Sequence, residues 1–320
     1  MTEDLAMTYT PATRRTMYFI GVTTQKSSIM KVFPAWSAHL GLNAEMKGID
    51  FAPNSDPAEY RGAVAFIKSD PLSLGALVTT HKVNLLKASR DLFDTLDPYA
   101  QTLNEISSIS KRDGRLIGHA KDPISAGASF EAIVPSGHWA TGAELCLLGS
   151  GGSSLALTLY LHNKKAATGE VPSRITVTAR REASLAEMRH VHSQIGFSIP
   201  IDYRLAPTPV EADAIVGQLP ARSMVVNATG LGKDGPGSPL TDAVNFPQGG
   251  LVWEFNYRGD LVFLDQARAA AGPRSLTVHD GWVYFIHGWT RVIAEVFDTP
   301  IPMSGPAFDV LSRIAKDATS

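Results

Sequence analysis

A lysine and an aspartate each stand where an apolar stretch gives way to a helical pattern. Residues 77–84 read LVTTHKVN, which puts Lys82 at the start of a helical segment, and GRLIGHAKDP puts Asp122 at the end of another strand-like run. If the two side chains converge on a cleft, one can pass a proton to or from a substrate oxygen while the other orients or charges it. The alternative for Lys82 is a solvated residue at the start of a surface helix.

A glycine-rich turn forms a second candidate site, because it follows the apolar run ELCLL and opens a helical pattern. Glycine lets the backbone turn tightly and approach a pyrophosphate, whose charge then lies against the helix N-terminal amides. A tight turn without a ligand is the alternative. The order of strand, turn and helix favours a dinucleotide-binding unit. The residues of this turn are Gly149, Ser150, Gly151, Gly152 and Ser153.

The next predicted strand, RITVTARR, ends in Arg180 and Arg181, and the first acid after them is Glu182. An acid at this place would hold the ribose 2′-hydroxyl of NAD, whereas basic residues suit a 2′-phosphate. The sequence therefore favours NADP, although two solvated arginines at a strand end remain the alternative. The strand MVVNATG places Asn227 and Thr229 at a further carboxyl end, on the rim where such sheets bind ligands.

Short apolar segments alternate with amphipathic ones from Met17 onwards, which predicts an α/β fold with two domains. We expect a tail without order at residues 1–15. An N-terminal open α/β domain for the substrate would comprise residues 16–125 and 281–320, and a Rossmann-type NADP-binding domain residues 126–280. Asp113-Gly114 between two strand-like runs predicts a hairpin. The substrate would bind in a cleft between the domains.

The composition is that of a globular protein, with 320 residues, 44% of them hydrophobic, and a formal net charge of −2. This charge gives no reason to expect nucleic acid or an anionic membrane as a partner. The single cysteine, Cys146, lies in an apolar run and cannot form an internal disulfide, which fits a reducing compartment. The chain carries no signal peptide pattern and no apolar run of membrane-spanning length. We expect a cytoplasmic monomer or homodimer.

Several of these segments together resemble the shikimate/quinate dehydrogenase family over nearly the whole chain. LDPYAQTLNEISSISKRDGRLIGHAKDP resembles the family's Asp-Pro-x-Ala…Asp-Gly-x-Leu-x-Gly-x-x-x-Asp segment. GSGGSS resembles its Gly-Ala-Gly-Gly-Ala/Ser turn, VVNATGLG its Asn-Ala-Thr-x-x-Gly segment, and Asp280-Gly281 the start of its final helix. The resemblance implies that Lys82 and Asp122 are the catalytic lysine and aspartate. It also implies hydride transfer with a nicotinamide cofactor.

The segments that hold the substrate in the family differ in this chain. Gln25 stands in place of the first serine of the family's Ser-x-Ser pair, whose second serine is Ser27. The Val-Thr-x-Pro-x-Lys segment is one residue shorter and lacks its proline. Ser107 replaces one asparagine, Ala120 replaces a second, and the glutamine of the last helix falls near His287. Because a site that hydrogen-bonds a hydroxyl discriminates through those bonds, shikimate is not the expected substrate.

These differences predict a reshaped substrate pocket. For His287 and Trp282 the alternative is internal packing. Lys121 could anchor a substrate carboxylate, although strand alternation would point it away from Asp122. Our candidates for contact with the substrate are Gln25, Ser27, Thr79, Ser107, Tyr257, Trp282 and His287.

We expect no metal site, because His190 and His192 are two residues apart on a predicted helix and point in different directions. The function that the sequence favours is NADP-dependent hydride transfer to or from a cyclic hydroxy or oxo acid, a small molecule. An ordinary shikimate or quinate dehydrogenase is one alternative. A non-catalytic sensor that binds a nucleotide or metabolite is another, although a sensor has no chemical need for the Lys82–Asp122 pair.

Overall fold

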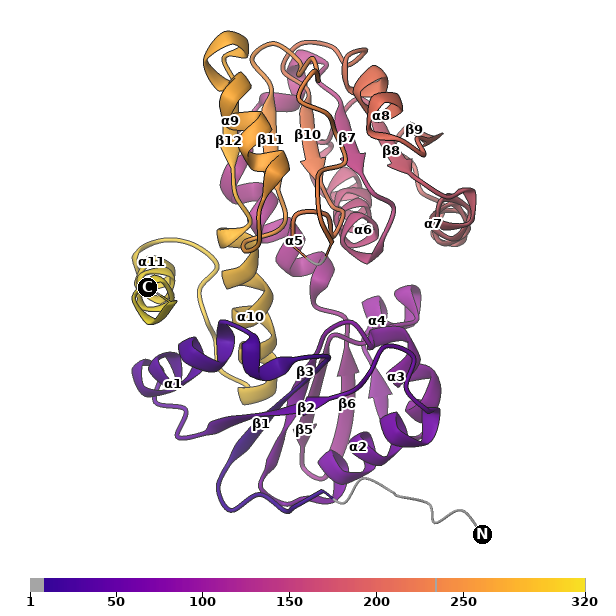
Figure 1. The fold of residues 1–320 in the computed structure, drawn as a ribbon. Helices are drawn as coiled ribbons and strands as arrows, with labels where there is room; N and C mark the ends of the chain where they lie inside the picture. The colour runs from indigo at the N-terminus through magenta and orange to yellow at the C-terminus, as the bar shows by residue number, and fades with distance from the viewer. Residues whose placement is uncertain (1–8, 234, 320) are drawn as a thin grey trace. The chain divides into compact units, whose positions relative to one another are not determined.

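The computed structural model describes residues 9–233 and 235–319. The chain divides into two units, one made of the residues up to Lys121 and from Gly288 onwards, and one made of Asp122–His287 (Figure 1). The expected boundaries, at residues 125/126 and 280/281, lie four and seven residues from these. Helix α10, Trp282–Phe297, is continuous across the second boundary.

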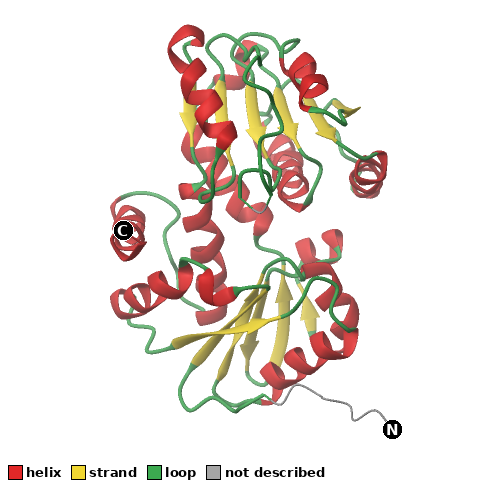
Figure 2. Cartoon of the chain, viewed as in Figure 1, coloured by secondary structure: helices red, strands yellow, loops and turns green. Residues whose placement is uncertain are grey.

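The first unit contains a six-stranded mixed sheet in the order β2-β1-β3-β5-β6-β4 (Figure 2). Strands β2, β1 and β3 are parallel, β5 is antiparallel to β3 and β6, and β4 is parallel to β6. The turn between β5 and β6 has positive φ at both Asp113 and Gly114, which confirms the predicted hairpin. The strands are β1 Thr16–Gly21, β2 Glu45–Asp50, β3 Ser73–Val78, β4 Thr95–Leu96, β5 Ser108–Arg112 and β6 Arg115–His119.

The helices of the first unit cover both faces of this sheet. Helix α1 connects β1 to β2 and helix α2 connects β2 back to β3, so right-handed crossovers place these two helices on opposite faces. The indole of Trp36 in α1 donates a hydrogen bond of 2.9 Å to the carbonyl of Leu311 in the C-terminal helix. The helices are α1 Ile29–His39, α2 Pro57–Ser69, α3 Lys82–Ser89, α4 Pro98–Leu103 and α11 Pro306–Thr319, with 3-10 turns η1 Thr24–Lys26 and η2 Arg90–Leu92.

The expected tail at residues 1–15 differs from the structure in its second half. Residues 1–8 lie outside the described residues. Tyr9, however, stacks on Phe66 with ring centroids 4.9 Å apart, and the amide of Ala12 donates a hydrogen bond of 2.9 Å to Asp70. The polar composition of this segment does not predict the contacts of Tyr9 and Ala12, because each depends on a partner far away in the sequence.

The second unit is built on a parallel sheet in the order β12-β11-β10-β7-β8-β9. This is the doubly wound arrangement of dinucleotide-binding domains. Side chains of β7, Leu145–Leu148, alternate between two cores. Leu145 and Leu147 pack against the helices of residues 122–133, 152–168 and 182–194, and Cys146 and Leu148 pack against those of residues 209–216 and 262–274. Burial raises the pKa of the Cys146 thiol to about 12, so this cysteine is an unreactive core residue.

Although Thr208–Glu211 form a capping box with Pro209 at the start of one helix, two strands and two helices of the second unit were not predicted from the sequence. These are β9, whose side chains are only partly buried, the three-residue strand β12, and helices α8 and α9. The strands are β7 Leu145–Leu148, β8 Ile175–Ala179, β9 Ile201–Leu205, β10 Met224–Asn227, β11 Leu251–Glu254 and β12 Thr277–His279. The helices are α5 Asp122–Ile133, α6 Gly152–Thr168, α7 Glu182–Gln194, α8 Pro209–Val216 and α9 Val262–Arg274, with the 3-10 turn η3 His138–Thr141. No helix in the described part of the chain has the length and apolarity that a membrane crossing requires.

Candidate active site

Lys82 is the first residue of α3 and follows the carboxyl end of β3. The amide of Thr79 donates a hydrogen bond of 3.0 Å to the carbonyl of Ile20, which extends the pairing of β1 and β3 by one residue. Thr80 then takes a left-handed conformation with φ of 42°, and the amide of His81 bonds back to the carbonyl of Thr79. The chain therefore reverses within two residues, which places the half-buried Lys82 at this edge of the sheet.

Most of the predicted substrate residues of the first unit lie at this same edge. Gln25, in η1, and Ser27 follow the carboxyl end of β1, and Thr79 follows that of β3. Strand β5 runs in the opposite direction, so Ser107, directly before it, also lies at this edge. Gln25 is exposed, Ser27 and Thr79 are half-buried, and Ser107 is only 2% exposed. Three separate segments thus bring residues to the edge that holds Lys82.

Asp122 is the first residue of α5 and follows β6 through Ala120 and Lys121. Strand β6 runs parallel to β3, so it ends at the edge just described. The amide of Lys121 donates a hydrogen bond of 2.8 Å to the hydroxyl of Ser107. Ser107 therefore fixes the chain immediately before Asp122, in addition to any contact with a substrate. Lys82 and Asp122 belong to different units, and their pairing stays a prediction.

The side chain of Lys121 is already paired. Its amino group lies 2.5 Å from a carboxylate oxygen of Glu295 in α10, and only 12% of the side chain is exposed. The same carboxylate lies 2.8 Å from Arg112 and 3.4 Å from His119. Burial acts to raise the pKa of Glu295, but the hydrogen bond from Lys121 and the neighbouring positive charges outweigh it and hold the pKa below its ordinary value. A carboxylate-anchor role for Lys121 is thus not favoured.

We expect Glu295→Gln to destabilise the protein by roughly 2–4 kcal/mol at neutral pH, because it leaves mostly buried positive charges without their partner. Since the folded pKa of Glu295 is lowered, its contribution is present above the ordinary carboxyl pKa of 4.5 and is lost as the pH falls through the folded value. Urea unfolding at neutral and acidic pH measures both effects. Asp91→Asn breaks an exposed ion pair with Arg61 and should have a much smaller effect. Equal losses in the two variants would contradict this account.

The remaining predicted substrate residues lie in the second unit. The ring of Tyr257 packs 4.2 Å from that of Phe285, and Trp282 lies 5.4 Å from the same ring. Both side chains are half-buried. His287 is fully buried in α10, and its carbonyl accepts a hydrogen bond of 3.3 Å from Ser125 in α5. Burial favours internal packing for His287, whereas Tyr257 and Trp282 keep part of their surface.

The glycine-rich turn has the form that the sequence predicts. Gly149 follows β7 with φ of 106°, and a Cβ at this position would lie 3.1 Å from the carbonyl oxygen of Ala228, so both conformation and space require glycine. Helix α6 begins at Gly152, and no side chain in the described part of the chain caps its first amides. The hydroxyl of Ser150 is buried and has no hydrogen-bond partner among the described residues. Free amides and a free hydroxyl at one turn fit a bound pyrophosphate.

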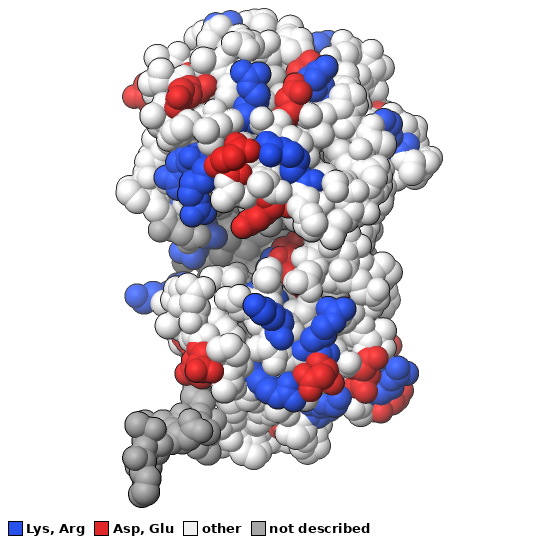
Figure 3. Space-filling model, turned by 90° about the vertical axis from the view of Figure 1, so that its right-hand side faces the viewer, with Lys and Arg blue, Asp and Glu red and all other residues white. Residues whose placement is uncertain are grey.

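Arg180 and Arg181 are exposed and follow β8 directly. Because β8 is parallel to β7 and adjacent to it, both arginines lie at the same sheet edge as the glycine-rich turn. Glu182, the first acid after them, forms an ion pair of 3.0 Å with Arg189. The acid is therefore engaged elsewhere while the arginines face solvent, which fits a 2′-phosphate better than a 2′-hydroxyl. On the face shown in Figure 3, Lys and Arg are interspersed with Asp and Glu and form no broad basic field.

Asn227 and Thr229 shape the turn after β10. The side-chain oxygen of Asn227 accepts hydrogen bonds from the amide and hydroxyl of Thr229, at 3.0 and 2.6 Å, and its amide donates to Glu254 at 2.7 Å. Asn227 is fully buried and Thr229 half-buried. Asn227 thus acts on the shape of this turn, and Thr229 is the residue of the two that keeps some exposed surface.

The sequence reading missed Glu254, the last residue of β11. It is fully buried, and it accepts hydrogen bonds from Asn227 and from both the amide and the side chain of Asn256. Burial raises the pKa of Glu254 to about 7, although these donors favour the ionised form. An acid that ends the apolar run LVWE was the signal that could have identified it.

We expect a pH-dependent stability term from Glu254. A folded pKa raised from 4.5 to about 7 means that its contribution is fully present below about pH 4.5 and is lost as the pH rises through 7. Relative to Glu254→Gln, the wild type should therefore lose at most roughly 3 kcal/mol of unfolding free energy between about pH 5 and about pH 8. Chemical denaturation of both proteins across this range tests it. A difference that stays constant with pH would contradict the assignment.

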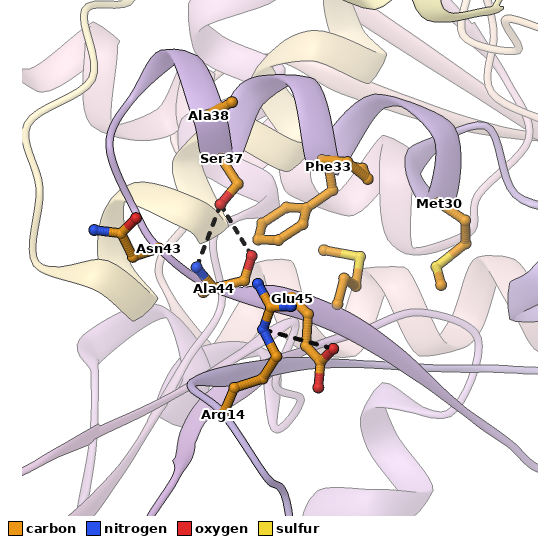
Figure 4. Close-up of a pocket in the computed structure, with 10 residues that line it drawn as sticks. Arg14, Met30, Phe33, Ser37, Ala38, Asn43, Ala44 and Glu45 are labelled. Carbon is orange, nitrogen blue, oxygen red and sulfur yellow. Dashed lines mark hydrogen bonds and ion pairs between the residues drawn. The ribbon is translucent and has the colours of Figure 1, made fainter.

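The structure also contains a pocket of about 430 Å³ in the first unit, between α1 and β2 (Figure 4). Its wall is largely apolar and includes Met30, Phe33 and Met46. Its charged groups are Arg14 and Glu45, which lie 3.8 Å apart. No predicted site residue lines this pocket, so it is separate from the candidate active site.

Among residues 9–233 and 235–319, no group of three or more His, Cys, Asp and Glu side chains could hold a metal ion. His190 is exposed, whereas His192 is buried between the hydroxyls of Thr158 and Tyr203, at 2.8 and 2.6 Å. Burial lowers the pKa of His192 to about 4. The two histidines therefore point in different directions, as their spacing predicts.

Comparison with known proteins supports the resemblance seen in the sequence. No protein-family model matches the chain. The chain is 26% identical over 165 residues to the shikimate dehydrogenase (NADP(+)) of Lactococcus lactis subsp. cremoris (strain MG1363), covering 52% of this chain and 54% of that protein. It thus spans about half the length of the curated relatives that it matches, between 45% and 59%.

Solved structures match almost the whole chain. A shikimate dehydrogenase in complex with NADP+ superposes with a TM-score of 0.71 at 17% identity and covers 96% of both chains. A 5-ketofructose reductase of Gluconobacter sp. strain CHM43 superposes with a TM-score of 0.67 at 16% identity, covering 95% of this chain and 98% of that one. The predicted two-domain α/β fold is confirmed, and the chain is similar to the shikimate dehydrogenases in sequence and fold.

Proposed function

From this similarity to the shikimate dehydrogenases, we propose that the protein is an NADP-dependent oxidoreductase acting on a cyclic hydroxy or oxo acid. The observation that carries the proposal is the carboxyl edge of the second sheet. There, a glycine-rich turn with uncapped helix amides lies beside two exposed arginines. The turn would hold the pyrophosphate, and Arg180 and Arg181 the 2′-phosphate. The bound cofactor supplies or accepts the hydride.

Lys82 and Asp122 would manage the proton that accompanies the hydride. In the reducing direction, the Lys82 ammonium donates a proton to the carbonyl oxygen, and in the oxidising direction the amine accepts it from the hydroxyl. Asp122 is proposed as the second residue of this pair. The position of Lys82 at the edge shared with Gln25, Ser27 and Thr79 supports this role, because these side chains could orient the reacting carbon.

The substrate is proposed to differ from shikimate. Gln25 carries an amide where the family pattern has a serine hydroxyl, and Ser107 carries a hydroxyl where it has an asparagine amide, so neither reproduces the family's group at its position. The structural match to a 5-ketofructose reductase is an example of this fold with another named substrate. An ordinary shikimate or quinate dehydrogenase is the second candidate, supported by the named relatives. We further propose that the protein acts in the cytoplasm as a monomer or homodimer.

A panel of substrates tests the proposal. Shikimate, quinate and other cyclic hydroxy acids, together with their oxo forms and 5-ketofructose, are incubated with the protein and NADP or NADPH while the reduced nicotinamide absorbance is followed. We expect turnover of at least one oxo or hydroxy acid, with shikimate a weak substrate or none. Efficient turnover of shikimate would favour the second candidate. Tight NADPH binding without turnover of any compound would favour a nucleotide-binding sensor.

A further inference from the structure

His81, directly before Lys82, is buried and makes two side-chain hydrogen bonds. Its Nδ1 lies 3.0 Å from the Tyr60 hydroxyl and its Nε2 lies 3.2 Å from the carbonyl oxygen of Gly21. A carbonyl oxygen can only accept, so Nε2 carries a hydrogen and donates it to Gly21. With 2% of the residue exposed, the ring is held in one orientation between the end of β1 and helix α2.

The aromatic side chains around His81 belong to the core of the first unit. Phe51 meets the His81 ring edge-on at 5.8 Å, and the Tyr60 ring lies 5.3 Å away. Phe51 and Tyr60 are both buried and pack in the same hydrophobic cluster. The imidazole is therefore attached to a rigid part of the unit.

The backbone that precedes His81 is strained. Thr80 has φ of 42°, and a β-branched residue in this region carries a cost of roughly 1–3 kcal/mol. Such a conformation persists only where the surrounding structure determines it. The amide of His81 bonds to Thr79 across this turn, and its side chain bonds to Gly21 and Tyr60. The residue thus holds the turn by its main chain and its side chain.

We propose that His81 is a positioning residue: its two buried hydrogen bonds fix the strained turn and thereby the direction of the Lys82 side chain. The proposal rests on the role proposed above for Lys82. It assigns no contact with the substrate to His81, which is enclosed by the core. A displacement of about 1 Å at a reacting group can reduce turnover by roughly 10²-fold, so a loosened turn should have a measurable effect.

The experiment measures the reactivity of Lys82 by competitive acetylation with acetic anhydride, read by mass spectrometry of the peptide that contains it, as a function of pH. The variants are His81→Phe, which loses both bonds, and His81→Gln, whose side-chain amide can still donate to Gly21. Tyr60→Phe removes only the hydrogen bond between the Tyr60 hydroxyl and Nδ1 of His81. We expect His81→Phe to change the acetylation rate of Lys82 severalfold and His81→Gln to recover most of the wild-type rate. Turnover of the best substrate should fall by about tenfold to 10²-fold in His81→Phe, with an unchanged KM for NADP.

His192→Gln is the matched control, because His192 is another buried histidine with two side-chain hydrogen bonds and lies in the second unit. It should lower the melting temperature without changing Lys82 acetylation. Wild-type acetylation in folded His81→Phe would overturn the proposal, as would equal changes in His81→Phe and His81→Gln. If His81→Phe does not fold, wild-type acetylation in folded His81→Leu, which also loses both bonds, would count against the proposal in the same way. Full turnover in Lys82→Ala would instead contradict the proposed role of Lys82 in proton transfer. This result is measured separately from the acetylation rates, so the two proposals can fail independently.

Discussion

Lys82→Ala should lower turnover by roughly 10²–10⁴-fold, the usual effect of removing a positioned general acid or base. The binding of NADPH should be unchanged, because Lys82 belongs to the first unit and the glycine-rich turn to the second. Initial rates at saturating substrate and a direct NADPH titration measure the two effects separately. Because the loss occurs in the proton-transfer step, kcat should fall more than KM rises.

Lys87→Ala is the matched control for this prediction. Lys87 lies on the same helix α3, and its side chain is exposed. Its removal should leave turnover within about twofold of the wild type, since surface substitutions of this kind have small effects. Turnover in Lys82→Ala as high as in Lys87→Ala would contradict the assignment of Lys82 to proton transfer.

The double substitution of Arg180 and Arg181 by serine should weaken NADPH binding by roughly 10²- to 10⁴-fold, because each of two charge-assisted hydrogen bonds contributes about 1.5–3 kcal/mol. The affinity for NADH should change little, since NADH has no 2′-phosphate. Titration with both nucleotides measures the ratio of the two affinities. The two single variants measure how much each arginine contributes to the affinity for NADPH.

Arg174→Ala is the control for the arginine pair. Arg174 immediately precedes β8, at the opposite end of the strand from Arg180, and forms an exposed ion pair with Asp202. Its removal should not change the ratio of NADPH to NADH affinity. An equal loss of affinity for NADPH and NADH in the arginine double variant would mean that these residues do not bind the 2′-phosphate.

Elements with strong periodicity and turn signals could be predicted from the sequence. The glycine-rich turn, the Asp113-Gly114 hairpin and the position of Lys82 at a strand end all follow from local patterns. Short or partly exposed elements could not be recognised in this way. Strand β4 has two residues, and β12 has three, so neither shows enough of a period-two pattern to be distinguished from a loop.

The partners of individual side chains could not be predicted, because they depend on distant parts of the chain. Lys121 pairs with Glu295, which lies 174 residues away. Strand alternation correctly raised doubt about Lys121 as a substrate anchor but could not identify this carboxylate. Glu254 was missed for the same reason, since its significance comes from burial and from the amide groups of Asn227 and Asn256.

The fold of this chain is shared by enzymes with different named substrates, so function depends on particular residues. The two sheet edges described above contribute separate parts of the proposed reaction. One edge, with Arg180 and the glycine-rich turn, would select the cofactor, and the other, with Lys82, would handle the proton. Changes such as Gln25 would then affect only substrate binding. Under the proposed function, this separation would explain why the predicted cofactor residues follow the family pattern while the predicted substrate residues depart from it.

The central claim is that the protein binds NADP through the glycine-rich turn and the two arginines. Its most direct test is a titration of the purified protein with NADPH and with NADH, monitored by tryptophan and nicotinamide fluorescence. We predict saturable binding of NADPH that is at least about tenfold tighter than that of NADH, the ratio expected from one charge-assisted contact to the 2′-phosphate. Absence of saturable binding by either nucleotide would contradict the account, because the glycine-rich turn and the two arginines would then have no cofactor to hold.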